Sequence, residues 1–287
     1  MPMKGILLMC FGTGTYGMYA YNMAHSIKHY NPDLSIHLLC DNESIEDINT
    51  AIFDSFDIID FDTDENGRRD NCLAKIKLFE RTPFDETLYL DVDGVCLSEI
   101  GELWNKLEDK DLFVQMIDSG KKTDKIEYSI WADNETIWDH FNLKEDSILP
   151  ALQTSFIYFK RPDYVKKFFG KVEENYKNRL PENKYTAMWG KSKQHPDELY
   201  YSVTMAQLGI LPDKSIQPIC FPQKTIGVTE LFKDYQFLSM YGAQGLVKPF
   251  AFNVYDRVMF NVMGEKKLPH YYKAHKLYKG KFAGKKK

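Results

Sequence analysis

The segment "KGILLMCFGTGTYGMYAYNMAHSI" (residues 4–27) decides the fold class of this chain. An apolar run ends in the glycine-rich turn "GTGTYG" (12–17), and a helical segment follows it. A second apolar run, "LSIHLLCDN" (34–42), comes next. The order strand, glycine-rich turn, helix, strand is that of a βαβ unit, whose two strands are parallel. The segment therefore predicts a layered α/β sheet.

The same alternation continues downstream. Further strands are predicted at 86–93, 111–118 and 154–160, and helices at 74–82, 162–180 and 195–210. The second of these helices is amphipathic, with one apolar stripe formed by Val165, Phe168, Phe169, Val172 and Tyr176. We expect one domain, with a nucleotide-binding core at 1–211, its C-terminal part at 212–265 and a tail at 266–287.

Composition narrows the class of protein. With 287 residues, 44% of them hydrophobic, the chain can bury a core. Its five cysteines are scattered and lack a C-x-x-C pair, which argues against a disulfide framework and favours a reducing compartment. The apolar run near the start is too short for a signal peptide or a membrane span. These features predict a cytoplasmic protein.

The C-terminal tail has the opposite charge to the rest of the chain. Residues 266–287 contain nine lysines and no acid, although the whole chain has a net charge of −4. Aromatic residues interleave with these lysines, as in segments that contact phosphates or a membrane surface. A solvated terminus remains the alternative.

The motif "LYLDVDGVCL" (88–97) places two carboxylates at the end of an apolar run. In a regular strand Asp91 and Asp93 point to the same face, where their like charges repel unless a cation lies between them. Oxygen ligands suit Mg²⁺ or Mn²⁺, and such ions commonly serve phosphate-bearing substrates. The motif therefore predicts a divalent-cation site.

Two other chemistries compete for these residues. "GTGTYG" satisfies the dinucleotide-binding pattern, and Asp41 ends the next strand where a ribose-binding acid belongs, which would suit an NAD(P)-dependent oxidoreductase. "DVDGV" also resembles the first motif of haloacid-dehalogenase-type phosphatases, in which Asp91 would be the nucleophile. That family normally begins with this strand, whereas here about 90 residues precede it.

A third hypothesis uses more of the chain. The segment "AKIKLFERTPFDETLYLDVDGVCLSEIGELW" (74–104) resembles the donor site of GT-A-fold glycosyltransferases, particularly family 8, which includes glycogenin. The resemblance implies a mixed, mainly parallel sheet flanked by helices. It also implies that Asp91 and Asp93 bind the metal, and that Lys75 contacts the nucleotide sugar.

The resemblance extends more loosely to both sides of this segment. It implies that Thr13 and Tyr16 line the base and ribose. It places Gln153, in "LQTSFIYFK", against the sugar, and Asp197 with Glu198, in "PDELYY", beside the reacting carbon. Two acids at a helix start also occur simply because they complement the helix dipole.

The chain departs from the family near its end. Family members close the site with a His-x-x-Gly-x-x-Lys-Pro-Trp segment, whose His is the third metal ligand and whose Lys binds the diphosphate. Here "GAQGLVKPF" (242–250) keeps Lys248 but has Gly242 in place of the His. His270 and Lys276 recur at the His-to-Lys spacing, and His275 is a second candidate ligand.

The predicted activity is transfer of a sugar, with retention, from a nucleotide sugar, most simply a UDP-sugar, with Mn²⁺ or Mg²⁺ as cofactor. The acceptor stays open among a glycan, lipid, protein or nucleic acid, and the basic tail favours an anionic one. A non-catalytic nucleotide-sugar-binding protein is the remaining alternative.

Overall fold

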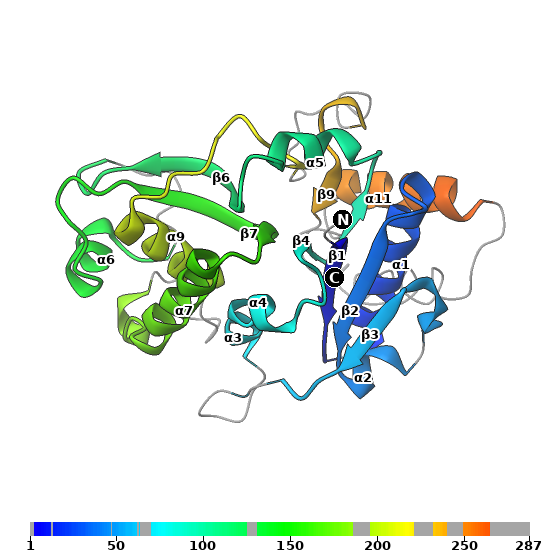
Figure 1. The fold of residues 1–287 in the computed structure, drawn as a ribbon, viewed down its shortest axis with the longest axis horizontal. Helices are drawn as coiled ribbons and strands as arrows, with labels where there is room; N and C mark the ends of the chain where they lie inside the picture. Colours follow the sequence, from blue (N-terminus) through cyan, green and yellow to red (C-terminus); the bar gives the residue numbers. More distant parts are fainter. Residues whose placement is uncertain are drawn as a thin grey trace, which may run out of the picture. The chain divides into compact units, whose positions relative to one another are not determined.

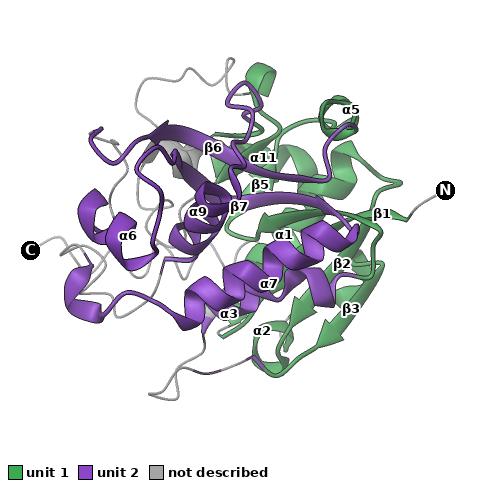
Figure 2. Cartoon of the chain, turned by 60° about the vertical axis from the view of Figure 1, so that its left-hand side comes forward, with its two compact units in different colours: residues 1–60, 83–108, 218–287 green, residues 61–82, 109–217 purple. Residues whose placement is uncertain are grey.

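The computed structural model describes residues 3–12, 14–46, 48–61, 63, 70–124, 131–185, 196–220, 232–239 and 249–264. The chain divides into two compact units (Figures 1 and 2): unit 1 contains residues 1–60, 83–108 and 218–287, and unit 2 contains residues 61–82 and 109–217. Within the described residues, no helix has the length and apolar character needed to cross a membrane.

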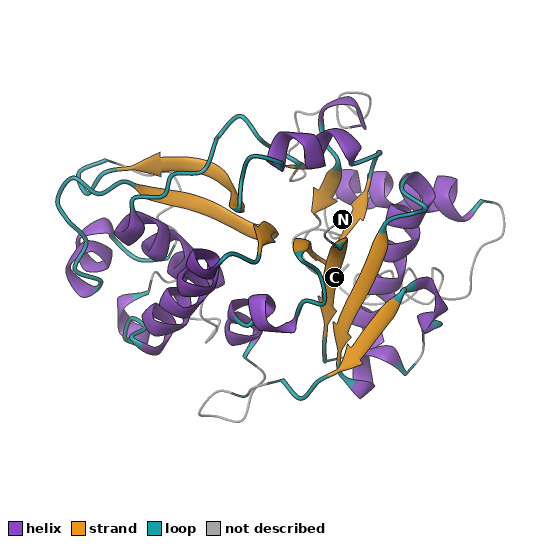
Figure 3. Cartoon of the chain, in the orientation of Figure 1, coloured by secondary structure: helices purple, strands orange, loops and turns teal. Residues whose placement is uncertain are grey.

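Unit 1 is built on four parallel strands in the order β3-β2-β1-β4. The strands are β1 (Lys4–Cys10), β2 (Ser35–Cys40), β3 (Ser55–Ile58) and β4 (Glu86–Asp91). Helix α1 (Gly14–Tyr30) connects β1 to β2, and the short helices α2 (Asn42–Ile45) and η1 (Thr50–Ile52) lead to β3 (Figure 3). Because the strands are parallel, β1, β2 and β4 end at the same edge of the sheet, where Met9 is in register with Asp91.

A smaller sheet in unit 1 has the order β5-β9-β8. It consists of β5 (Gly94–Cys96), β9 (Phe237–Ser239) and β8 (Ile219–Cys220), and helices α5 (Gly101–Leu107) and α11 (Pro249–Met263) complete the unit. The hydroxyl of Ser26 on α1 accepts a hydrogen bond from the Cys96 amide at 2.9 Å. The side-chain amide of Asn22 donates to the Tyr255 hydroxyl at 2.7 Å. Helix α1 is thus fixed to both β5 and α11.

Gly94, directly after the two acids, allows β5 and β9 to pair closely. A Cβ atom at this position would lie 2.4 Å from the backbone oxygen of Leu238, so part of the β5–β9 pair would have to move. We expect Gly94→Ala to lower the free energy of unfolding by about 1–3 kcal/mol. Gly101→Ala is the matched control, because nothing lies within 4 Å of its added Cβ. Urea denaturation measures both, and equal midpoints would contradict the prediction.

Unit 2 contains two antiparallel strands and the helices that pack around them. The strands are β6 (Leu112–Gly120) and β7 (Leu149–Lys160). The helices are α3 (Asn71–Ile76), α4 (Leu78–Arg81), α6 (Asn134–His140), α7 (Asp163–Lys177), η2 (Glu182–Lys184) and α9 (Asp197–Leu208). Helix α9 packs on β7, and α7 packs on α9.

The apolar stripe predicted for α7 is confirmed, because all five of its side chains are buried. Phe168 and Phe169 meet Tyr201 of α9 with ring centroids 6.0 Å apart in both pairs, and Phe169 lies 5.1 Å from Phe159 of β7. Aromatic pairs at these separations add to the stabilisation from apolar burial. This cluster holds α9 against the sheet and so fixes the position of its first residue, Asp197.

The predicted α/β class and the main strands are confirmed, with differences in detail. The helix predicted at 74–82 is divided at Lys77, whose ψ of 8° leaves the helical range. Strand β7 begins at Leu149, before the predicted residue 154. Strand β4 ends at Asp91, and Asp93 lies in a bend, since the chain turns there to enter β5. The strand predicted at 86–93 is therefore too long, and Asp91 and Asp93 do not share a face through regular strand alternation. The division of the chain at residue 211 stays a prediction.

Candidate functional site

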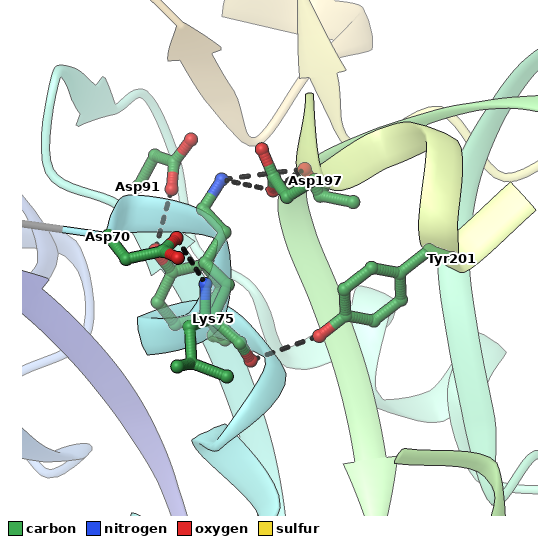
Figure 4. Close-up of polar contacts among 8 residues, drawn as sticks. Asp70, Lys75, Asp91, Asp197 and Tyr201 are labelled. Atoms are coloured by element: carbon green, nitrogen blue, oxygen red, sulfur yellow. Dashed lines mark hydrogen bonds and ion pairs between the residues drawn. The ribbon is translucent and has the colours of Figure 1, made fainter. Parts of the chain in front are cut away.

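The predicted metal-binding acids lie at the carboxyl edge of the parallel sheet in unit 1. Asp91 is the last residue of β4, and Asp93 follows in the bend before β5; both side chains are partly exposed. The buried Tyr89 donates its hydroxyl hydrogen bond to Oδ1 of Asp91 at 2.7 Å (Figure 4). This bond orients the carboxylate of Asp91 at the sheet edge, where open α/β sheets bind their ligands.

Tyr16, in the first turn of α1, lies within electrostatic range of these two acids. Burial raises the pKa of the Tyr16 hydroxyl, and the negative charges of Asp93 and then Asp91 raise it further. Both carboxylates therefore lie within electrostatic range of one hydroxyl, although they do not share a regular strand. The Tyr16 side chain is 41% exposed, so it also faces solvent.

Asp41 organises the turn between β1 and α1. Its Oδ2 accepts a hydrogen bond from the Gly12 amide at 2.9 Å, and its Oδ1 accepts one from the Ser44 amide at 2.8 Å, which caps α2. Gly12 has a φ of 98°, a conformation that glycine adopts without strain. Both carboxylate oxygens of Asp41 therefore hold backbone, and the structure gives this residue a positioning role in the turn.

Unit 2 brings together Lys75 and Asp197 (Figure 4), and Thr154 contacts both. Nζ of Lys75 on α3 lies 3.0 Å from Oδ2 of Asp197, the first residue of α9. Their side chains are only 13% and 18% exposed, so water screens this ion pair weakly. Thr154 of β7 is fully buried and donates its hydroxyl hydrogen bond to the same Asp197 oxygen at 2.6 Å.

The backbone around Lys75 is held at two points. Asp70 caps α3 by accepting a hydrogen bond from the Leu73 amide at 3.0 Å, and the Tyr176 hydroxyl donates to the other oxygen of Asp70. The hydroxyl of the buried Tyr201 donates to the carbonyl oxygen of Lys75 at 3.0 Å. Burial, with the charge of Asp197 next in effect, holds the pKa of Tyr201 well above its ordinary value, so this hydroxyl stays protonated and donates.

Other predicted residues have less defined surroundings. Gln153 is half-buried on β7, in register with Gln115 of β6, and Glu198 is half-buried in the first turn of α9. Thr13, Lys248, His270, His275 and Lys276 lie outside the described residues. Within the described part of the chain, no group of three or more His, Cys, Asp or Glu side chains could hold a metal ion.

Three residues that hold the candidate site residues in place were not predicted from the sequence. Tyr89 orients Asp91, Thr154 binds Asp197, and Tyr201 holds the backbone of Lys75. No local sequence pattern marks these residues, because each acts on a partner that only the folded chain brings near. A surface cavity of about 460 Å³ in unit 2, lined by Asn142–Lys144, Asp146–Ile148 and 206–211, contains none of the candidate site residues.

Comparison with known proteins identifies the fold. No protein-family model matches the sequence, and a search of curated proteins also finds no match. Solved structures do match. A galactosyltransferase, LgtC, in complex with donor and acceptor sugar analogues, aligns with a TM-score of 0.57 at 14% identity, over 94% of this chain and 99% of LgtC. An active-site mutant of LgtC gives 0.57 at 16% identity, over 95% and 99%.

The bifunctional glycosyltransferase WbbM, solved in its apo form, aligns with a TM-score of 0.59 at 12% identity. The alignment covers 96% of this chain and 51% of WbbM, so the chain spans about half the length of that protein. At these identities the likeness establishes architecture, and it agrees with the fold expected from the sequence. The chain has the α/β fold of GT-A glycosyltransferases.

Proposed function

We propose that this chain transfers a sugar from a nucleotide sugar, with UDP-sugars as the first candidates, to an acceptor in a reaction that requires a divalent cation. The observation that carries the proposal is the placement of Asp91 at the end of β4 and Asp93 in the bend that follows, at the carboxyl edge of the parallel sheet in unit 1 and within electrostatic range of Tyr16. A ligand bound at this edge can be contacted by the first turn of α1, where Tyr16 would flank the base or ribose.

The residues at this edge fit a divalent cation. Two carboxylates and a nearby hydroxyl offer the oxygen ligands that Mg²⁺ and Mn²⁺ prefer, and such ions often take one or two protein carboxylates and complete their shell with substrate phosphates. When bound, the cation would neutralise charge that develops on the departing diphosphate. Tyr89 supports this role by fixing the orientation of the Asp91 carboxylate.

The remaining candidate residues would act on the sugar, the nucleotide and the diphosphate. Lys75, an ammonium on a long stem, would contact the nucleotide sugar, and Asp197 would act at the reacting carbon, with Glu198 and Gln153 toward the sugar. Thr13 would help bind the nucleotide, and Lys248 or Lys276 the diphosphate, while His270 would complete the metal ligands. These roles and the retaining outcome rest on the family resemblance.

Competing functions have weaker support. An NAD(P)-dependent enzyme would use Asp41 to bind ribose, whereas both carboxylate oxygens of Asp41 accept backbone hydrogen bonds. A haloacid-dehalogenase-type phosphatase would use Asp91 as nucleophile, but the chain has the fold of glycosyltransferases. A non-catalytic binding protein with a dead donor site would be expected to lack donor-site residues, whereas Asp91, Asp93 and Lys75 are all present.

The acceptor is the least constrained part of the proposal. The solved complex of LgtC contains an acceptor sugar analogue, which supports a glycan as the first acceptor class to test. Lipid, protein and nucleic-acid acceptors follow, and the lysine-rich tail supports an anionic one. A cytoplasmic location stays a prediction.

A screen of nucleotide sugars tests the function. We expect one nucleotide class, UDP first, to raise the melting temperature only when Mn²⁺ is present, because a ligand that binds the folded state stabilises it. The matching nucleotide sugar should then release free nucleotide diphosphate. Stabilisation by NAD(P), or release of phosphate from simple phosphoesters, would instead support the competing enzymes and contradict the proposal.

A further inference from the structure

The carboxylate of Asp197 is held by two hydrogen-bond donors of different kinds. Lys75 approaches its Oδ2 as a charged ammonium at 3.0 Å, and Thr154 donates a hydroxyl hydrogen bond to the same atom at 2.6 Å. Nζ of Lys75 also lies 3.4 Å from Oγ1 of Thr154. The three side chains come from α3, α9 and β7, so they link separate elements of unit 2 (Figure 4).

Thr154 lies at an irregular point of β7. The register with β6 moves from Val114 opposite Ile157 to Gln115 opposite Gln153, so three residues of β7 (154–156) lie between two successive pairings with β6. Such irregularities aim side chains away from the regular ladder and are common beside active sites. Here the irregularity contains Thr154, whose hydroxyl points to Asp197.

The two donors differ in how firmly they hold the carboxylate. Lysine is a point charge on a flexible stem with several rotatable bonds, and its ammonium can leave one anion for another. Threonine is short and branched at Cβ, so its χ1 angle has few options, and Thr154 is fully buried. Its hydroxyl therefore stays in place when a neighbouring side chain moves.

We propose that Thr154 is a positioning residue that keeps Asp197 oriented toward the reacting carbon while Lys75 contacts the nucleotide sugar. The inference rests on the proposed function, which needs Lys75 to exchange part of its interaction with Asp197 for the substrate's phosphates. Thr154 supplies the interaction that remains. Tyr201 complements it by holding the carbonyl of Lys75, so the side chain of Lys75 can move while its backbone stays.

Thr154→Val tests this role, because valine keeps the branched shape and removes the hydroxyl. We expect kcat to fall by about tenfold to a hundredfold, as for loss of a hydrogen bond to a charged group, with the KM for the nucleotide sugar within about twofold of wild type. Thr154→Ser keeps the hydroxyl and should recover most of kcat. A purely structural role for Thr154 would instead lower the melting temperature of Thr154→Val and leave the kcat of the folded protein unchanged.

Thr204→Val is the matched control. Thr204 is also fully buried in unit 2, but its hydroxyl donates to the Tyr200 carbonyl at 2.7 Å and accepts from Asn175, away from Asp197. This variant should lower the melting temperature and leave the kcat of the folded protein unchanged. A loss of kcat equal to that of Thr154→Val would overturn the inference, because any lost buried hydroxyl would then have the same effect.

A double-mutant cycle with Asp197→Ala tests whether the loss of kcat in Thr154→Val acts through Asp197. If Thr154 acts through Asp197, Thr154→Val should cost almost nothing in kcat once the carboxylate is gone. If Thr154→Val still lowers kcat by the same factor when Asp197 is alanine, the inference is wrong. Normal kcat in the single variant Thr154→Val would also overturn it. Neither outcome would contradict the proposed function. A wild-type chain that turns over no nucleotide sugar would instead overturn the proposed function, and this role with it.

Discussion

Asp91→Asn and Asp93→Asn are each expected to abolish the metal-dependent part of nucleotide binding while the fold survives. Each substitution removes a charged oxygen ligand, and loss of a ligand should weaken metal-dependent affinity by about a hundredfold or more. The free energy of unfolding of each variant should equal or exceed that of the wild type. An asparagine oxygen at position 91 can still accept the hydrogen bond from Tyr89, and either change relieves repulsion between the two acids. Calorimetric titration with UDP, with and without Mn²⁺, measures the loss.

Asp33→Asn is the control for charge alone, because Asp33 is an exposed acid of unit 1 in the loop after α1. It should leave metal-dependent binding unchanged. The two site variants also permit a check without metal: each removes a negative charge that raises the pKa of Tyr16, so the Tyr16 hydroxyl should ionise at lower pH than in wild type. Metal-dependent UDP affinity that is undiminished in both site variants would exclude this carboxylate pair as the metal site.

The elements that can be predicted from the sequence are those whose burial leaves a clear pattern, either a continuous apolar run or an apolar stripe at helical spacing. Strands β1 and β2 are almost wholly buried apolar runs, and α7 has one continuous apolar stripe. Strand β3 could not be predicted in this way, because its four residues, Ser55–Ile58, are all exposed and it exists through pairing with β2. Strands β8 and β9 contain two and three residues, too few to show alternation, and depend on pairing within the smaller sheet.

The candidate site follows from the sequence only where its residues are close in the chain. The two acids of "DVD" are such a case, although the structure brings them together through a bend rather than a regular strand. The place of Asp41 after an apolar run suits ribose binding, yet its carboxylate accepts hydrogen bonds from the amides of Gly12 and Ser44, which only the folded chain brings near. The contact between Thr154 and Asp197 joins β7 to α9, and no spacing in the sequence encodes it.

Asp197→Asn is expected to lower turnover by orders of magnitude with little change in nucleotide affinity. Asparagine keeps the shape of the side chain and an oxygen that can accept from Thr154, but it removes the charge that would act at the reacting carbon. It also leaves Lys75, 13% exposed, without the charge of its ion-pair partner, so some loss of stability should accompany the substitution. Single-turnover kinetics and UDP calorimetry, both corrected for the folded fraction, separate these effects.

Asp163→Asn provides a matched control for the simpler explanation that Asp197 only complements a helix dipole. Asp163 is the first residue of α7 and follows Pro162, just as Asp197 is the first residue of α9 and follows Pro196. Loss of its charge should cost about 0.3–1 kcal/mol of stability and leave turnover unchanged. If Asp197→Asn behaves in the same way, with near-normal turnover, Asp197 only complements the dipole of α9 and pairs with Lys75. A loss of turnover confined to Asp197→Asn would instead show that the carboxylate held by Lys75 and Thr154 takes part in the reaction, since the two helix starts differ chiefly in those contacts.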